Sequence, residues 1–167
     1  MTSNFILVKI DKNYCNYLRN FDSKVPYNYD KKINRPFIGV LFKVNNYEYF
    51  APLSSPKKKH LKMKNTIDFH KIKNGELGAI NFNNMIPVNK NNYELVDLSS
   101  KNINSSESKY QKLLIEQLTW LNENNIQVRN KSLKLYNLYN SNKLSNNIKN
   151  RCCNYKLLEE KCNEYDK

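Results

Sequence analysis

The chain has few of the residues from which common nucleotide and metal sites are built. Its 167 residues include only 3 glycines, and neither a GxGxxG nor a GxxxxGK[ST] pattern occurs, which argues against a glycine-lined phosphate cradle. The 15 acidic residues are scattered and form no DxD or HxxE motif, so the carboxylate cluster of a metal-dependent nuclease is not expected. We therefore expect neither a metal ion nor a cofactor.

Cysteine pairs and long apolar runs are also missing. The four cysteines are Cys15, Cys152, Cys153 and Cys162, and none of them belongs to a CxxC pair of the kind that binds zinc. We expect each of them to be a small, buried or partly exposed thiol, since burial is common for free cysteine. Because no signal peptide and no apolar run near 18 residues is found, we expect a cytoplasmic protein with reduced thiols and no membrane partner.

Positive charge is abundant. The 28 Lys and Arg against 15 Asp and Glu give a formal net charge of +13, which favours polyanionic partners whose binding weakens with salt. The 12 Tyr and 7 Phe supply core material and surfaces on which bases could stack. The length suits one domain over residues 1–167.

Hydrophobic patterning predicts strands first and helices afterwards. Strands are expected at residues 5–10, 37–44, 47–51, 67–72 and 77–82, with shorter ones at 85–88 and 93–98. Asp11 is a candidate N-cap for an early helix, and Ser105 or Ser106 is a candidate N-cap for a second helix. A further helix is expected over about 127–140, and Asn154 is a candidate N-cap for a last short helix. This order predicts an α+β fold, an antiparallel sheet with helices packed on it and a helical C-terminal half.

The most informative segment is residues 51–60, with the sequence APLSSPKKKH, directly after an expected strand. Ser54, Ser55 and Lys57 would bring hydroxyl donors and an ammonium to the edge of the sheet, a combination that suits a phosphate. The alternative is a solvated charged edge. The preceding loop, residues 22–36, is basic and aromatic and is either a binding loop or a solvated connector.

The two histidines limit the possible chemistry. His70 belongs to an alternating strand, where a structural role is the more common one, whereas His60 follows the lysine run and is a candidate phosphate or base contact. Metal-free cleavage of RNA by its own 2′-hydroxyl remains possible. In it, Ser54, Ser55 and Lys57 would hold the phosphate and stabilise its charge, and Lys57 could also transfer a proton. Tyr27 or Tyr29 on the basic loop could hold a base or take part in proton transfer.

The chain resembles the ToxN/AbiQ endoribonucleases, toxins of type III toxin–antitoxin systems. Segment 50–60 is similar to the family signature, and four further segments match in the same order. These are residues 22–26, 35–40, 78–87 and 153–161.

The resemblance implies a twisted antiparallel sheet related to the MazF/Kid-like barrels, surrounded by helices. It implies metal-independent cleavage of cellular and phage mRNA to a 2′,3′-cyclic phosphate, growth arrest and abortive phage infection. The implied partner is an antitoxin RNA with tandem pseudoknot repeats, which the enzyme processes and with which it forms a closed ring. DNA is not an expected partner.

Carried over by position, the family's catalytic core falls on Ser54, Ser55, Pro56 and Lys57, with Ser54 where relatives often have Thr. Tyr29 is placed as the catalytic loop tyrosine, with Tyr27 as the alternative. The residues expected to bind RNA are Tyr27, Lys31, Lys32, Arg35, Lys58, Lys59 and His60.

Two other functions fit the residues. A non-catalytic RNA-binding repressor would use the same basic surface without cutting RNA. A basic protein that docks on an acidic protein is the third reading, although the interleaved aromatic and basic residues at 27–37 suit nucleic acid better.

Overall fold

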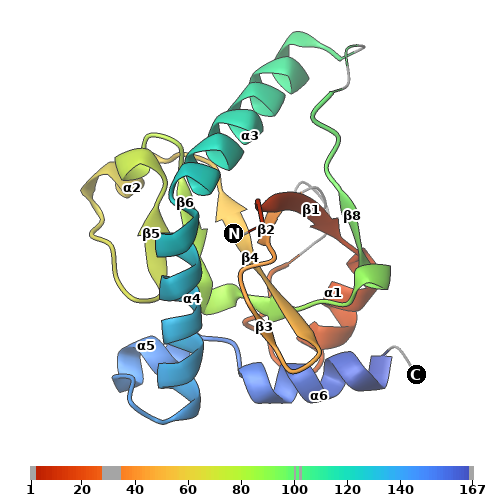
Figure 1. Ribbon diagram of the computed structural model, residues 1–167, viewed down its shortest axis with the longest axis vertical. Coiled ribbons are helices and arrows are strands. Elements are labelled where there is room, and N and C mark those ends of the chain that lie inside the picture. Colours follow the sequence, from red (N-terminus) through yellow and green to blue (C-terminus); the bar gives the residue numbers. More distant parts are fainter. Residues whose placement is uncertain (1–2, 28–34, 100, 102, 166–167) are drawn as a thin grey trace.

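The computed structural model describes residues 3–27, 35–99, 101 and 103–165 (Figure 1). The strands are β1 (Ile6–Ile10), β2 (Phe37–Gly39), β3 (Lys43–Val44), β4 (Tyr47–Ser54), β5 (Phe69–Lys71), β6 (Ala79–Asn81), β7 (Ile86–Pro87) and β8 (Tyr93–Leu95). The helices are α1 (Lys12–Arg19), α2 (Lys58–Lys62), α3 (Ser105–Glu123), α4 (Asn125–Asn140), α5 (Asn146–Arg151) and α6 (Tyr155–Tyr165). Short 3₁₀ turns occur at η2 (Lys73–Gly75), η3 (Phe82–Asn84) and η4 (Lys90–Asn92).

Strand β4 is the hub of the sheet. It pairs antiparallel with β2, β3, β6 and β7, and the strand order across the sheet is β5-β6-β4-β2-β1-β8. The α+β class and the antiparallel sheet are confirmed. The MazF/Kid-like barrel is not confirmed, because within the described residues the end strands β5 and β8 do not pair and the sheet stays open.

Helices cover the sheet from the C-terminal half of the chain. Figure 1 shows α3 and α4 following one another along one side of the molecule, while α6 packs next to α1. The core cluster joins both halves of the sequence and includes Leu18, Phe50, Leu135 and Leu158. None of the helices in the described part of the chain is both long enough and apolar enough to cross a membrane.

Two of the predicted helix caps are confirmed. The Tyr14 backbone N–H donates to Asp11 Oδ1 at 2.9 Å, and the Leu157 N–H donates to Asn154 Oδ1 at 3.2 Å. These bonds satisfy backbone donors that the first turn of each helix leaves free. The helix that Asn154 caps runs over 11 residues to Tyr165.

Three predictions of local structure were wrong. The long strand expected at 37–44 is divided into β2 and β3. Helix α3 is capped by Asn104 rather than by a serine, since Asn104 Oδ1 accepts from the Glu107 N–H at 2.8 Å and Glu107 Oε2 accepts from the Asn104 N–H at 3.2 Å. Helices α2 and α5 were not expected; at 5 and 6 residues they are too short to show helical periodicity.

The four cysteines are free and buried, as the sequence predicts. Burial raises the pKa of the Cys152 thiol to about 11, and it raises the pKa of the Cys153 thiol well above its ordinary value. Both side chains therefore act as small apolar groups in the core.

Glu159 links β4 to the C-terminal helices through a buried network. Its Oε1 accepts hydrogen bonds from the Tyr49 hydroxyl at 2.7 Å and from the Tyr136 hydroxyl at 2.6 Å. Burial first, and the Glu159 carboxylate second, raise the pKa of Tyr49, so this phenol remains a donor. The network ties β4 to α4 and α6, and thereby supports the strand whose end is Ser54.

We expect Tyr49→Phe to lower the free energy of unfolding by about 1.5–3 kcal/mol, because it takes a donor from a buried carboxylate. Tyr47→Phe is the matched control on the same strand. Tyr47 is half-exposed and its hydroxyl accepts a hydrogen bond from the exposed Asn163, so a change within about 0.5 kcal/mol is expected. Urea unfolding followed by circular dichroism measures both. Equal losses in the two variants would contradict the stabilising role of the Glu159 network.

Candidate functional site

The hydroxyl–lysine segment lies where β4 ends. Ser54 is the last residue of the strand and is half-buried, and its Oγ accepts a hydrogen bond of 2.8 Å from Asn81 Nδ2 on β6. Ser55 and Lys57 follow in exposed positions, and Lys57 precedes the first residue of α2. The sheet therefore fixes one hydroxyl and presents the next hydroxyl and the ammonium to solvent.

His60 holds the backbone of Lys57. The imidazole Nδ1 of His60 accepts a hydrogen bond from the backbone N–H of Lys57 at 3.1 Å, and the backbone N–H of His60 donates to the Lys57 carbonyl at 2.9 Å. Burial, and then the charges of Lys59 and Lys57, lower the pKa of His60, so the imidazole is neutral with its proton on Nε2. With only 2% of the residue exposed, His60 positions Lys57, and its direct contact with RNA stays a prediction.

Gly78 allows the main chain of the β6 hairpin to approach Ser54. Its φ is +97°, and a Cβ placed on it would lie 1.9 Å from the Ser54 carbonyl oxygen. Both the backbone angle and the lack of space demand glycine at this position. The end of β4 is thus set by a contact between two backbones.

A groove of about 390 Å³ opens beside this end of the strand. Its polar and cationic lining residues include Ser54, Lys57, Lys59, Lys64, Asn81 and Arg151. Of the sequence-predicted residues it thus brings together Ser54, Lys57, Lys59 and His60. Such a lining suits a chain of phosphates.

The sequence did not reveal the ion pair between Asp68 and Arg151 in the groove lining. Asp68 accepts from Arg151 Nε at 2.9 Å, from Arg151 Nη2 at 3.1 Å and from the Thr66 hydroxyl at 2.8 Å. Burial opposes ionisation of Asp68, but the hydrogen bonds from Arg151 and Thr66 outweigh it and lower the pKa of Asp68. No sequence signal pairs two residues 83 positions apart, although the alternation around Asp68 indicated a strand.

Arg35 lies two residues before β2, outside the groove lining. Leu53 N–H donates to the Pro36 carbonyl at 3.0 Å, and the pairing of Phe37 with Pro52 continues toward Arg35 opposite Ser54. Burial lowers the pKa of Arg35, against an opposing effect of Tyr110 from α3. The guanidinium stays charged because its ordinary pKa is so high.

The remaining predicted residues are dispersed or lie outside the described residues. Lys58 is exposed on α2, away from the groove lining, and Tyr27 is half-buried with the Arg19 guanidinium 4.9 Å from its ring centre. The predicted residues Tyr29, Lys31 and Lys32 lie outside the described part of the chain. In that described part, no group of three or more His, Cys, Asp or Glu is placed to hold a metal ion.

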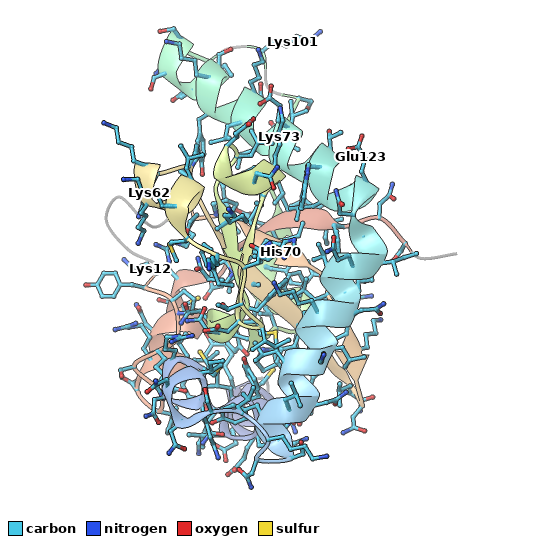
Figure 2. All side chains as sticks on the ribbon, turned by 90° about the vertical axis from the view of Figure 1, so that its left-hand side faces the viewer. Lys12, Lys62, His70, Lys73, Lys101 and Glu123 are labelled. Carbon is cyan, nitrogen blue, oxygen red and sulfur yellow. The ribbon has the colours of Figure 1, made fainter. Side chains whose placement is uncertain are left out.

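His70 is buried between the sheet and α4, apart from the groove. Figure 2 shows it in the middle of the molecule, whereas Lys62 points outward at the edge. Lys131 Nζ lies 2.9 Å from His70 Nδ1 and donates to the Phe69 carbonyl at 3.1 Å. Burial first, and Lys131 second, lower the pKa of His70 to about 4, and burial lowers the pKa of Lys131 to about 8. A structural role for His70 fits this environment.

Comparisons with known proteins point to one family. Residues 6–163 match the family model described as the toxin ToxN of type III toxin–antitoxin systems. An endoribonuclease ToxN from Bacillus thuringiensis subsp. kurstaki is 36% identical over 160 residues, which cover 93% of this chain and 81% of that relative.

Two solved structures are similar over nearly the whole chain. One, concerned with selective toxin inhibition by a non-coding RNA pseudoknot, has a TM-score of 0.83 and 34% identity, covering 99% of each chain. The other is AbiQ, a lactococcal anti-phage endoribonuclease of a type III toxin–antitoxin system. Its TM-score is 0.83 and its identity 27%, covering 98% of this chain and 99% of that one.

The buried His70 predicts acid sensitivity. Because its pKa in the folded protein is about 4, below the unfolded value near 6.5, the unfolded state binds more protons between these values. Stability should therefore fall as the pH drops through this window, by about 2 kcal/mol between pH 7 and pH 4.5. His70→Gln should reduce that pH dependence. Urea unfolding at both pH values measures it, and an unchanged dependence in the variant would contradict the assignment.

Proposed function

The chain belongs to the ToxN family of endoribonuclease toxins of type III toxin–antitoxin systems, and from this premise we propose that it cleaves RNA without a metal ion. The observation that carries the proposal is the groove in which Ser54, Lys57 and further cations meet at the end of β4. These groups can hold and neutralise a phosphodiester while its own ribose attacks it.

The hydroxyls and Lys57 would act on the oxygens of the scissile phosphate. Since Ser54 Oγ accepts its hydrogen bond from Asn81, its own proton is available for a non-bridging oxygen. Ser55, next along the exposed edge, offers a second hydroxyl donor. The Lys57 ammonium supplies charge to the phosphorane, in which negative charge accumulates during attack. A single positioned donor of this kind is worth about 3–4 kcal/mol.

The reaction exchanges one phosphorus–oxygen bond for another. The 2′-oxygen loses its proton and bonds to phosphorus, while the bond from phosphorus to the 5′-oxygen breaks and that oxygen gains a proton. The products are a 2′,3′-cyclic phosphate and a 5′-hydroxyl. Lys57 and Tyr29 are our candidates for the two proton transfers, with Tyr27 as the alternative tyrosine. Arg35 binds phosphate only, because a guanidinium does not release its proton at ordinary pH.

The proposed partner is an antitoxin RNA with tandem pseudoknot repeats, which the toxin processes and with which it forms a closed ring. One structural neighbour is described through toxin inhibition by an RNA pseudoknot, and another as an anti-phage enzyme. Cellular and phage mRNAs are the proposed substrates, so cleavage arrests growth and aborts infection. Lys59 in the groove lining, the exposed Lys58 next to it in the sequence and a formal net charge of +13 suit these RNAs. We treat residues 1–167 as one functional domain.

Cleavage of single-stranded RNA is expected to continue in excess EDTA and to leave 5′-hydroxyl ends, because the nucleophile belongs to the RNA itself. Kinase labelling of the products without prior phosphatase treatment detects such ends. Products with 5′-phosphates, or complete inhibition by chelation, would contradict the mechanism.

Lys57→Ala and Ser55→Ala should each lower the single-turnover cleavage rate by about 10²–10³-fold, since each removes a group that stabilises the transition state. Affinity for the antitoxin RNA should change little. Lys62→Ala is the matched control, because Lys62 is an exposed lysine of α2 outside the groove lining. Activity that follows RNA affinity alone, with no cleavage by the parent protein, would instead support a non-catalytic RNA-binding repressor.

A further inference from the structure

Arg151 reaches the groove from the C-terminal half of the chain. It is the last residue of α5, and its side chain lines the same groove as Ser54 and Lys57. The proposed mechanism gives it no role, because the expected site comes entirely from the N-terminal half. Its geometry nevertheless differs from that of a surface ion pair.

We propose that Arg151, oriented by Asp68, binds an RNA backbone phosphate next to the one that is cleaved. The inference rests on the proposed function and adds a phosphate-binding residue to the same groove. Asp68 acts as its positioning residue, because the buried carboxylate touches the guanidinium and does not need to touch RNA.

The exposure of the two side chains is unequal. The Asp68 side chain is 3% exposed, whereas that of Arg151 is 49% exposed. The guanidinium has five N–H groups, and two of them, one on Nε and one on Nη2, donate to Asp68. The two N–H groups on Nη1 and the second one on Nη2 can donate to a ligand. A planar guanidinium held along one edge presents its other donors at a fixed angle, which suits bidentate contact with phosphate.

The main chain around Arg151 is also fixed. Asn83 N–H donates to the Asp68 carbonyl at 3.2 Å, and Cys153 N–H donates to the Asn83 carbonyl at 2.8 Å. The Asn83 side chain in turn approaches the Arg151 carbonyl at 3.5 Å. Turn η3 therefore connects Asp68 to the end of α5. Arg151 is held both at its main chain, by Asn83, and at its guanidinium, by Asp68.

The cations of the groove come from separate elements that a bound RNA strand could span. Lys57 and Lys59 belong to the α2 side, and Figure 1 shows α2 and α5 beyond opposite ends of β5. A strand bound at Lys57 and continuing past β5 would bring a later phosphate to Arg151. The guanidinium is then expected to contribute to affinity and register more than to bond breaking.

The test compares binding with cleavage. Affinity is measured by fluorescence anisotropy for a mixed-sequence single-stranded oligonucleotide carrying 2′-O-methyl groups throughout, which cannot cleave itself, at several salt concentrations. Cleavage of the matching RNA is measured under single-turnover conditions. Lys149→Gln is the control, since Lys149 is a cation of the same helix that bonds to Asn142 outside the groove lining.

Arg151→Gln is expected to weaken binding about tenfold and to reduce the slope of log K against log[salt] by about 0.7, the loss of one single-strand phosphate contact. The cleavage rate at saturating enzyme should change by less than about threefold. Arg151→Lys should retain most of the salt slope, because it keeps the charge. Lys149→Gln should leave both measurements unchanged.

A double variant, Asp68→Asn with Arg151→Gln, separates phosphate binding from folding. It avoids an unpaired buried carboxylate and should show the same reduced slope as Arg151→Gln alone. A salt slope equal to that of the parent in both variants would overturn the inference and leave Arg151 as a link between α5 and the turn before β5. Failure of the parent to cleave RNA would instead refute the proposed function, whereas the binding slope decides the role of Arg151 independently.

Discussion

The site depends on the pairing of β4 with its four neighbouring strands. Backbone hydrogen bonds to β2, β3, β6 and β7 fix the register of this strand, and residues 49–53 are buried one after another, so both of its faces are packed. Tyr49 adds a side-chain link to the helices through Glu159. Ser54 therefore emerges from the sheet at a position that the whole core determines.

Local signals made part of this structure predictable. The caps Asp11 and Asn154 were predictable because each side-chain oxygen accepts a hydrogen bond from a backbone N–H only three residues later, so the signal is local in the sequence. The segment from Ser54 to Lys57 was recognisable because its residues are adjacent in the sequence. The pair of Asp68 and Arg151 was not, since it depends on tertiary packing between distant segments. The open sheet likewise depends on which strands meet at its ends, and no local pattern records that.

The two histidines show how the protein separates structural from electrostatic roles. His60 and His70 each use Nδ1 toward a neighbouring nitrogen, the Lys57 N–H or the Lys131 ammonium, and both are buried. Both imidazoles therefore hold neighbouring parts of the protein in place. The positive charge of the groove resides on lysine and arginine side chains.

Gly78 gives this arrangement an unusual source of precision. The close approach of Ser54 and the β6 hairpin depends on one hydrogen atom at a position where a methyl group cannot fit. Drift in the surrounding aromatic core can change how firmly the protein is folded without altering that spacing. One solved structure keeps a similar fold at 34% sequence identity, so this backbone accommodates many changes of side chain.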